Sequence, residues 1–115
     1  MGKQAGLIEI LAFIRMYVIL YYGEGGNVIT KMLQVKNAGG LHVRPAGVLV
    51  KICRAFEAEV LLKFNGNKYN LKSVLGIISA GIKNGDSVEF ICDGVDEKEA
   101  LEAVVAAIES NFEIV

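Results

Sequence analysis

The sequence lacks tryptophan altogether, and it contains only one proline and one histidine among its 115 residues. It also lacks a strong charge of either sign, because 12 lysines and arginines nearly balance 13 aspartates and glutamates. The formal net charge of −1 excludes a general attraction to nucleic acid or to anionic membranes, although it allows a local charged patch. The apolar share of 53% can fill the core of one compact domain, and the length argues against two.

Cysteine is scarce as well. Cys53 and Cys92 each lie in an apolar stretch and have no CxxC spacing. A single histidine cannot complete a common zinc set, so the sequence predicts no metal and no cofactor. We interpret both cysteines as small buried side chains in a reducing compartment, with a disulfide or metal role as the alternative.

Residues 1–27 form an apolar extension that differs in composition from the domain expected over residues 28–115. Its apolar run, Leu7–Tyr22, is shorter than the roughly 20 residues that cross a bilayer, and it contains Glu9 and Arg15. A signal peptide also fits poorly, because no small-residue cleavage site follows. Three interpretations remain: a short apolar helix lying on the domain or on a membrane, a weak anchor, or a segment absent from the mature protein.

Back-translation favours the third interpretation. Glu24-Gly25-Gly26 can be encoded as GAA-GGA-GGT, which contains a purine-rich ribosome-binding sequence. Val28 follows at short spacing, and GTG can serve as a start codon. Our hypothesis is therefore that residues 1–27 reflect a mis-assigned translation start, and that translation begins near Val28 or Met32.

Residues 28–115 alternate between strand-like and helix-like patterns. Asn65-Gly66 predicts a hairpin turn between two strands, and Pro45 suits the first turn of a helix. Ser73 is a natural helix N-cap, and Asp96 with Glu99 predicts a capping box. The order β-α-β-β-α-β-α favours an α+β two-layer sandwich with a four-stranded antiparallel sheet and three helices on one face. The strands are expected over Ile29–Val35, Glu59–Phe64, Lys68–Leu71 and Ser87–Cys92.

The only histidine, His42, follows two glycines and precedes the predicted helix start at Pro45. Helix N-termini present unpaired N–H groups and a partial positive charge, so they bind anions readily. Arg44 can fork onto two phosphate oxygens, and a neutral imidazole is both a nucleophile and a leaving group. These residues point to phosphoryl transfer or to the binding of a phosphate ligand, and spacing alone does not distinguish the two. A surface or capping histidine is the plain alternative.

The segment Gly40–Ala46, GLHVRPA, resembles the active-site motif of HPr, the histidine-containing phosphocarrier of the bacterial phosphoenolpyruvate-dependent sugar phosphotransferase system. A second segment, Asn70–Gly76, is similar to the regulatory-serine segment of that family. The spacing of the two motifs and the predicted order of elements also match the family. The resemblance covers roughly residues 28–112 and implies the HPr-like open-faced sandwich.

The resemblance implies a role for each matched residue. His42 would accept a phosphoryl group from enzyme I on its Nδ1 atom and donate it to sugar-specific EIIA domains, and Arg44 would steady that group. Ser73 would be phosphorylated by HPr kinase/phosphorylase in carbon catabolite control, and this form would bind a catabolite-control transcription regulator. The protein would form a phosphohistidine intermediate and would not be an enzyme. It would be cytoplasmic and monomeric. It would bind no nucleic acid, and residues 28–115 would bind no membrane.

Two positions depart from the family pattern. Val43 stands where alanine is usual, and its stiffer side chain is expected to alter the transfer rate. Gly47 replaces a common threonine or alanine. The apolar residues Val74, Leu75 and Ile78 are predicted to form a partner-docking patch, with core packing as the alternative role.

Other functions remain open on sequence alone. Within the family, the alternative is a regulatory paralogue that acts mainly through Ser73, although His42 argues against it. A small-molecule or RNA-binding module is a second class, and the near-neutral charge argues against RNA. A membrane-tethered interaction protein built on residues 7–22 is a third. The sugars that are transported cannot be inferred, because a general carrier does not contact them.

Overall fold

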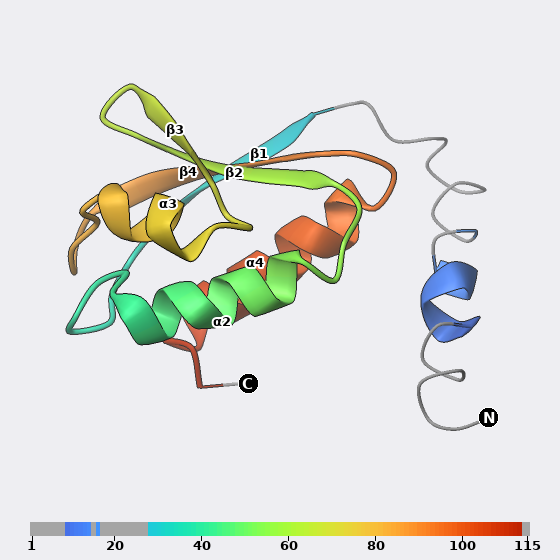
Figure 1. Ribbon diagram of the computed structural model, residues 1–115, viewed down its shortest axis with the longest axis horizontal. Coiled ribbons are helices and arrows are strands. Elements are labelled where there is room, and N and C mark those ends of the chain that lie inside the picture. The colour runs from blue at the N-terminus through green and yellow to red at the C-terminus, as the bar shows by residue number, and fades with distance from the viewer. Residues whose placement is uncertain (1–8, 15, 17–27, 114–115) are drawn as a thin grey trace.

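The computed structural model describes residues 9–14, 16 and 28–113. Within residues 28–113 the elements follow the predicted order, β-α-β-β-α-β-α. Figure 1 shows them as a sheet with the helices packed on one side. The bounds are β1 Ile29–Gln34, α2 Val43–Cys53, β2 Glu59–Phe64, β3 Asn67–Asn70, α3 Val74–Ser79, β4 Ser87–Asp93 and α4 Glu97–Glu109.

The sheet has the strand order β1-β4-β2-β3, and every neighbouring pair is antiparallel. Helix α4 packs on β1 and β4, while α2 packs between α4 and α3. All three helices therefore cover the same face, as Figure 1 shows. This arrangement confirms the predicted α+β open-faced sandwich.

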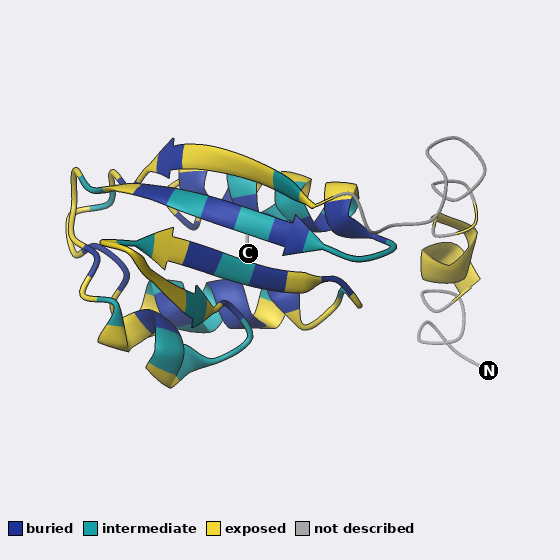
Figure 2. Ribbon diagram, turned by 90° about the horizontal axis from the view of Figure 1, so that it is seen from above, coloured by how far each residue is buried: buried dark blue, intermediate teal, exposed yellow. Residues whose placement is uncertain are grey.

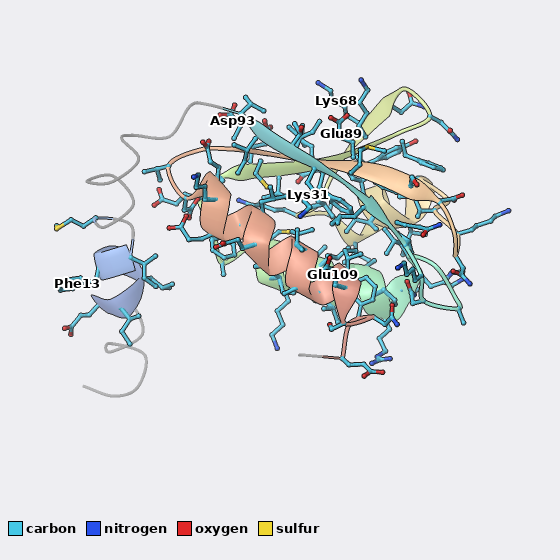
Figure 3. The ribbon with its side chains drawn as sticks, turned by 180° about the vertical axis from the view of Figure 1, so that it is seen from behind. Phe13, Lys31, Lys68, Glu89, Asp93 and Glu109 are labelled. Atoms are coloured by element: carbon cyan, nitrogen blue, oxygen red, sulfur yellow. The ribbon has the colours of Figure 1, made fainter. Side chains whose placement is uncertain are left out.

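Strand β4 shows how the alternating sequence creates the core. Val88, Phe90 and Cys92 are fully buried under the helices, and Glu89 and Ile91 between them are half-buried. Figure 2 shows such alternation as bands of colour along the strands of the sheet. On the open face, Figure 3 shows Lys68 and Glu89 projecting away from the helices. Met32 pairs with Glu89 across the β1–β4 ladder and is 59% exposed on this same face. Period-two alternation thus separates a buried face from a solvated one.

The hairpin between β2 and β3 forms where the sequence predicts it. Asn65 and Gly66 have φ values of 52° and 81°, the left-handed region that this two-residue turn requires. Strand β3 spans Asn67–Asn70, one residue earlier than predicted, because the turn contains only these two residues.

The buried face of α2 only partly matches the sequence pattern, in which the spacing of Val48, Leu49, Ile52, Cys53 and Phe56 predicts one helix face. The structure buries Ala46, Leu49, Val50 and Cys53, whereas Val48 and Ile52 are only half-buried and Phe56 lies beyond the helix end. The difference arises because α2 packs between α3 and α4. Ala46 and Val50 lie one turn apart on that face.

The predicted capping box at α4 is wrong. Asp96 is the N-cap residue but makes no side-chain cap bond. Its carboxylate instead accepts hydrogen bonds from the backbone N–H groups of Glu57 and Ala58, at 2.9 and 2.7 Å. Glu97 accepts a hydrogen bond from the N–H of Gly94 at 2.9 Å. The Asp96 carboxylate therefore satisfies two backbone N–H groups at the start of β2 instead of those of its own helix.

Most of the predicted apolar run, Leu7–Tyr22, lies outside the described residues. Residues 9–14 are helical, and Ile10 and Phe13 on this helix are exposed. Phe13 is labelled in Figure 3. Within residues 9–14, 16 and 28–113, no helix has both the length and the apolar character needed to cross a bilayer.

Candidate functional site

The loop before α2 is built around Asn37 and Gly40. The N–H of Gly40 donates to the Asn37 carbonyl at 3.0 Å, and the Asn37 side-chain amide donates to the Gly40 carbonyl at 2.6 Å. Gly40 has a φ of +66°, and a Cβ atom there would lie 2.4 Å from the Ile82 carbonyl oxygen. Only glycine fits this conformation and this approach. The N–H of Leu41 then donates to the Ile82 carbonyl at 3.1 Å, so the loop is held against the chain that follows α3.

His42 occupies the N-cap position of α2 in an extended conformation. Its carbonyl accepts the first helical hydrogen bond, from the N–H of Ala46 at 2.8 Å, but its side chain makes no cap bond. The residue is exposed. The imidazole is therefore not engaged in capping and is available for chemistry with a partner.

The start of α2 carries positive charge. The first helical turn contains no acidic residue, and Arg44 is exposed in that turn, two residues after His42. Pro45 lies in the same turn, where its missing N–H breaks no helical bond. Together with the partial positive charge of the helix N-terminus, Arg44 makes this end of α2 attractive to an anion.

Ser73 is the N-cap residue of α3, as predicted. Its Oγ accepts a hydrogen bond from the N–H of Gly76 at 3.0 Å, and the residue is half-buried. Ser73 lies at the far end of α3 from the His42 loop, because Ile82, the partner of Leu41, follows the C-terminal end of this helix. The six residues of α3, about 9 Å of helix, separate the two sites.

The predicted docking residues lie on α3, between Ser73 and the His42 loop. Leu75 is 80% exposed and Ile78 is 37% exposed, whereas Val74 is half-buried against the core. Val43, at the first position of α2, is 70% exposed beside His42. Val43 was predicted only to alter the transfer rate, and its place among the exposed apolar residues was not predicted. Its position directly after the exposed histidine was the signal that could have found it.

Lys51 and Arg54 on α2 are both exposed. The Arg54 guanidinium donates to the carbonyl of Lys72, with Nη2 at 3.2 Å, and this carbonyl belongs to the residue before Ser73. Arg54 therefore lies at the Ser73 end of α3 rather than at the His42 end.

A separate cavity of about 210 Å³ lies at the opposite end of α2 from His42. It is lined by Leu11 and Ile14 from the N-terminal helix, and by Phe56 and Glu99 from the domain, among others. Both carboxylate oxygens of Glu99 are buried, and burial raises the pKa of this residue. The cavity shares no residue with the His42 loop.

The two cysteines are buried free thiols. Burial raises the pKa of Cys53 to about 12 and that of Cys92 to about 11, so both remain protonated at neutral pH. Among the described residues, no group of three or more histidine, cysteine, aspartate or glutamate side chains is placed to hold a metal ion.

Known proteins of one family resemble this chain. A family model described as the PTS HPr component phosphorylation site matches residues 29–110. The chain is 38% identical over 84 residues to the HPr-like protein Crh of Halalkalibacterium halodurans, a match that covers 73% of this chain and 100% of that protein.

Solved structures agree. HPr from Thermoanaerobacter tengcongensis matches with a TM-score of 0.71 and 37% identity, covering 73% of this chain and 94% of that one. The phosphocarrier protein HPr from Bacillus anthracis matches with a TM-score of 0.69 and 34% identity, covering 72% of this chain and 99% of that one. Crh from Bacillus subtilis, described as a swapped dimer, matches with a TM-score of 0.60 and 36% identity, covering 68% of this chain and 90% of that one. The matched region coincides with the domain from β1 to α4, and the chain therefore belongs to the HPr family of phosphotransferase-system phosphocarrier proteins.

Proposed function

We propose that His42 accepts a phosphoryl group from enzyme I and donates it to sugar-specific EIIA domains. The observation that carries this proposal is the exposed imidazole at the N-terminus of α2, which makes no cap bond. A histidine that served only as a cap would use its side chain to satisfy the helix N–H groups. Here that side chain is left for a partner.

The transfer is a substitution at phosphorus. The lone pair of Nδ1 attacks the phosphorus atom of the donor, a new P–N bond forms, and the bond between phosphorus and the donor atom breaks with its electron pair returning to the donor. The ring proton stays on Nε2 while the Nδ1 lone pair attacks. The reverse attack, by an acceptor on the phosphohistidine, passes the group on and frees the Nδ1 lone pair of His42.

Arg44 stabilises the phosphoryl group on His42. The guanidinium is exposed in the first turn of α2, and it can donate two parallel hydrogen bonds to phosphate oxygens. The N-terminal N–H groups of α2 add positive charge on the same side of the chain. No acidic side chain in this turn opposes them.

Partners dock on the apolar residues near His42. Val74, Leu75 and Ile78 lie on α3, whose C-terminal end is joined to the His42 loop by the Leu41–Ile82 hydrogen bond. Leu75 and Ile78 are exposed large apolar side chains on a domain that otherwise buries most of them. Enzyme I and the EIIA domains use this patch in turn, since both must reach the same imidazole.

Ser73 regulates the carrier. HPr kinase/phosphorylase transfers a phosphoryl group from ATP to its Oγ, and the product binds a catabolite-control transcription regulator. A phosphate of charge about −1.5 to −2 at this N-cap is stabilised by the helix N–H groups. It lies at one end of the docking patch rather than on the imidazole, so it opposes enzyme I mainly by placing charge in the interface.

The second candidate is a regulatory paralogue that acts mainly through Ser73. The 38% identity to the HPr-like protein Crh favours it, and the related structure from Bacillus subtilis is described as a catabolite repression protein. The exposed His42 with Arg44 argues for carrier duty, because a regulator without that duty has no need for them. We place either form in the cytoplasm as a monomer that is not itself an enzyme, although HPr and Crh relatives are described as dimers.

One experiment separates the candidates. The purified protein is incubated with phosphoenolpyruvate and enzyme I, and intact mass spectrometry follows the gain of one acid-labile phosphoryl group. We expect labelling of the wild type, none of His42→Ala, and a shorter-lived label on Arg44→Ala. If the wild type is never labelled, or if His42→Ala still is, the carrier function is wrong. A parallel incubation with ATP and HPr kinase tests regulation, because acid-stable label that survives Ser73→Ala would refute the Ser73 assignment.

A further inference from the structure

The imidazole of His42 lies against Gly39. A Cβ atom added to Gly39 would be 2.9 Å from Cδ2 of His42, 3.7 Å from Nε2 and 3.9 Å from Cγ. Carbon atoms in good contact are about 3.5 to 4.0 Å apart, so the first of these distances is a clash. The ring therefore occupies the space that any side chain at position 39 would fill.

The backbone does not require glycine at this position. Gly40 has a positive φ, but Gly39 is not among the glycines with one. An L-residue can adopt the backbone conformation of Gly39, so the two neighbouring glycines differ in purpose. Gly40 allows the loop to turn and to approach Ile82, whereas the missing side chain of Gly39 makes room for the imidazole.

Both partners of this contact are held in place. Gly40 and Leu41 are hydrogen-bonded to Asn37 and Ile82, and the carbonyl of His42 accepts from Ala46. The backbone on either side of the contact is thus fixed, while the ring can still rotate about its two side-chain torsions. A new Cβ at position 39 would be accommodated by rotation of the ring rather than by movement of the loop.

The contact also selects which edge of the ring is presented. The Cδ2–Nε2 edge faces Gly39, and in a five-membered imidazole Nδ1 and Cε1 lie across the ring from Cδ2. The contact therefore leaves the Nδ1 side open. Rotation of the ring would move Nδ1 relative to Arg44 and to the N-terminus of α2, which do not move with it.

We propose that Gly39 is a positioning residue for phosphoryl transfer, because its missing side chain lets the His42 ring lean back and present Nδ1. This inference rests on the proposed function of His42. Attack on phosphorus requires close alignment of the reacting atoms, and a misplacement of 1 Å can cost about 100-fold in rate. A rotation forced by one methyl group displaces the ring by less than that, so we expect a loss of about tenfold.

The test compares Gly39→Ala with Gly47→Ala. Gly47 lies in α2 with nothing within 4 Å of its added Cβ, so alanine there leaves the site untouched and controls for the loss of a nearby glycine. Phosphohistidine formation from enzyme I is measured by quenched-flow for all three proteins. We expect Gly39→Ala to be about tenfold slower than wild type and Gly47→Ala to match wild type within about twofold.

A spectroscopic measurement does not depend on transfer. In the wild type we expect a nuclear Overhauser effect between Hδ2 of His42 and the Hα protons of Gly39, and in Gly39→Ala a shift of the His42 ring resonances that Gly47→Ala lacks. Absence of that effect in the wild type, or equal transfer rates for all three proteins, overturns the positioning role. A wild type that is folded but never phosphorylated overturns instead the proposed function, and the Overhauser effect still decides whether the ring contacts Gly39.

Discussion

The N–H of Leu41 donates to the carbonyl of Ile82 at 3.1 Å, which joins the loop before the exposed histidine to the chain that leaves α3. Two segments that lie about 40 residues apart in the sequence thereby form one surface. The close approach depends on Gly40, because a Cβ there would lie 2.4 Å from the same carbonyl oxygen. This backbone contact, together with the packing of α2 on α3, holds the site beside its docking patch.

Gly40→Ala is expected to destabilise the fold by roughly 3 kcal/mol. A left-handed conformation costs about 1–2 kcal/mol for a residue with a side chain, and separating the loop from Ile82 loses a buried hydrogen bond as well. Gly81→Ala is the matched control, because Gly81 has a φ of +68° but open space around its added Cβ. Urea unfolding should show that Gly81→Ala loses only the part of the free energy of unfolding that comes from the left-handed backbone conformation. Equal losses in the two variants would mean that the Ile82 contact contributes nothing.

Ser73→Ala is expected to lower the free energy of unfolding by about 1 kcal/mol even without phosphorylation. The alanine leaves the N–H of Gly76 without the hydroxyl that now accepts from it at 3.0 Å. Ser73→Asp keeps an acceptor at the N-cap and should remain within about 0.5 kcal/mol of the wild type. Ser79→Ala, which removes an exposed hydroxyl at the other end of α3, is the control. Thermal unfolding of the wild type and the three variants measures these differences in stability. If Ser73→Ala is as stable as the wild type, the Ser73 hydroxyl does not stabilise the helix as a cap.

Leu75→Ser is expected to raise the KM of enzyme I for this protein about tenfold, because the loss of a well-packed apolar anchor costs about 1.4 kcal/mol or more. Its stability should not change, since the side chain is 80% exposed. Met32→Ser is the control: Met32 is 59% exposed but lies on the open face of the sheet, away from the helices. Equal effects of the two substitutions on KM would locate docking elsewhere than on α3.

Local chemistry made much of the fold predictable. The Asn65–Gly66 turn, the Ser73 cap and the strand expected over Ser87–Cys92 each depend on a few neighbouring residues, and all three were confirmed. His42 could likewise be singled out as a candidate from its neighbours, because a helix start and Arg44 lie within three residues of it. Features with a short sequence range follow local rules that hold in any fold.

What could not be predicted depends on partners far along the chain. Asp96 has the right position for a capping box, but the N–H groups of Glu57 and Ala58 compete for its carboxylate and win. The centre of the buried face of α2 is likewise set by α3 and α4 on either side. The different roles of Gly39 and Gly40 cannot be read from their shared sequence context, because Gly39 faces the His42 ring and Gly40 faces the distant Ile82.

The alkaline stability of the protein should depend on Cys53. Burial raises the pKa of its thiol to about 12 from 9.0, so above pH 9 the unfolded chain releases a proton that the folded protein retains. Stability is therefore full below pH 9 and falls as pH rises toward 12, with a loss of about 1.4 kcal/mol from this thiol between pH 8 and pH 10. Urea unfolding at the two pH values should show a smaller loss for Cys53→Ala. Val50→Ala also shortens a buried side chain of α2 but has no titrating group, so it should keep the whole loss.

The start of β1 separates the two candidate translation starts. Met32 lies in the middle of the strand, paired with Glu89, whereas Val28 precedes its first residue, Ile29, which pairs with Cys92 and packs against the core. A chain that begins at Val28 keeps β1 whole, whereas one that begins at Met32 does not. A chain beginning at Met32 loses half of β1 and should be less stable than one beginning at position 28 by roughly 2–4 kcal/mol, from lost ladder hydrogen bonds and the burial of Ile29. Urea unfolding of the two chains measures this difference in stability, and equal stability would contradict it.

The intact mass of the protein from its native source tests the translation start itself, because a mass that includes residues 1–20 would exclude a start at Val28.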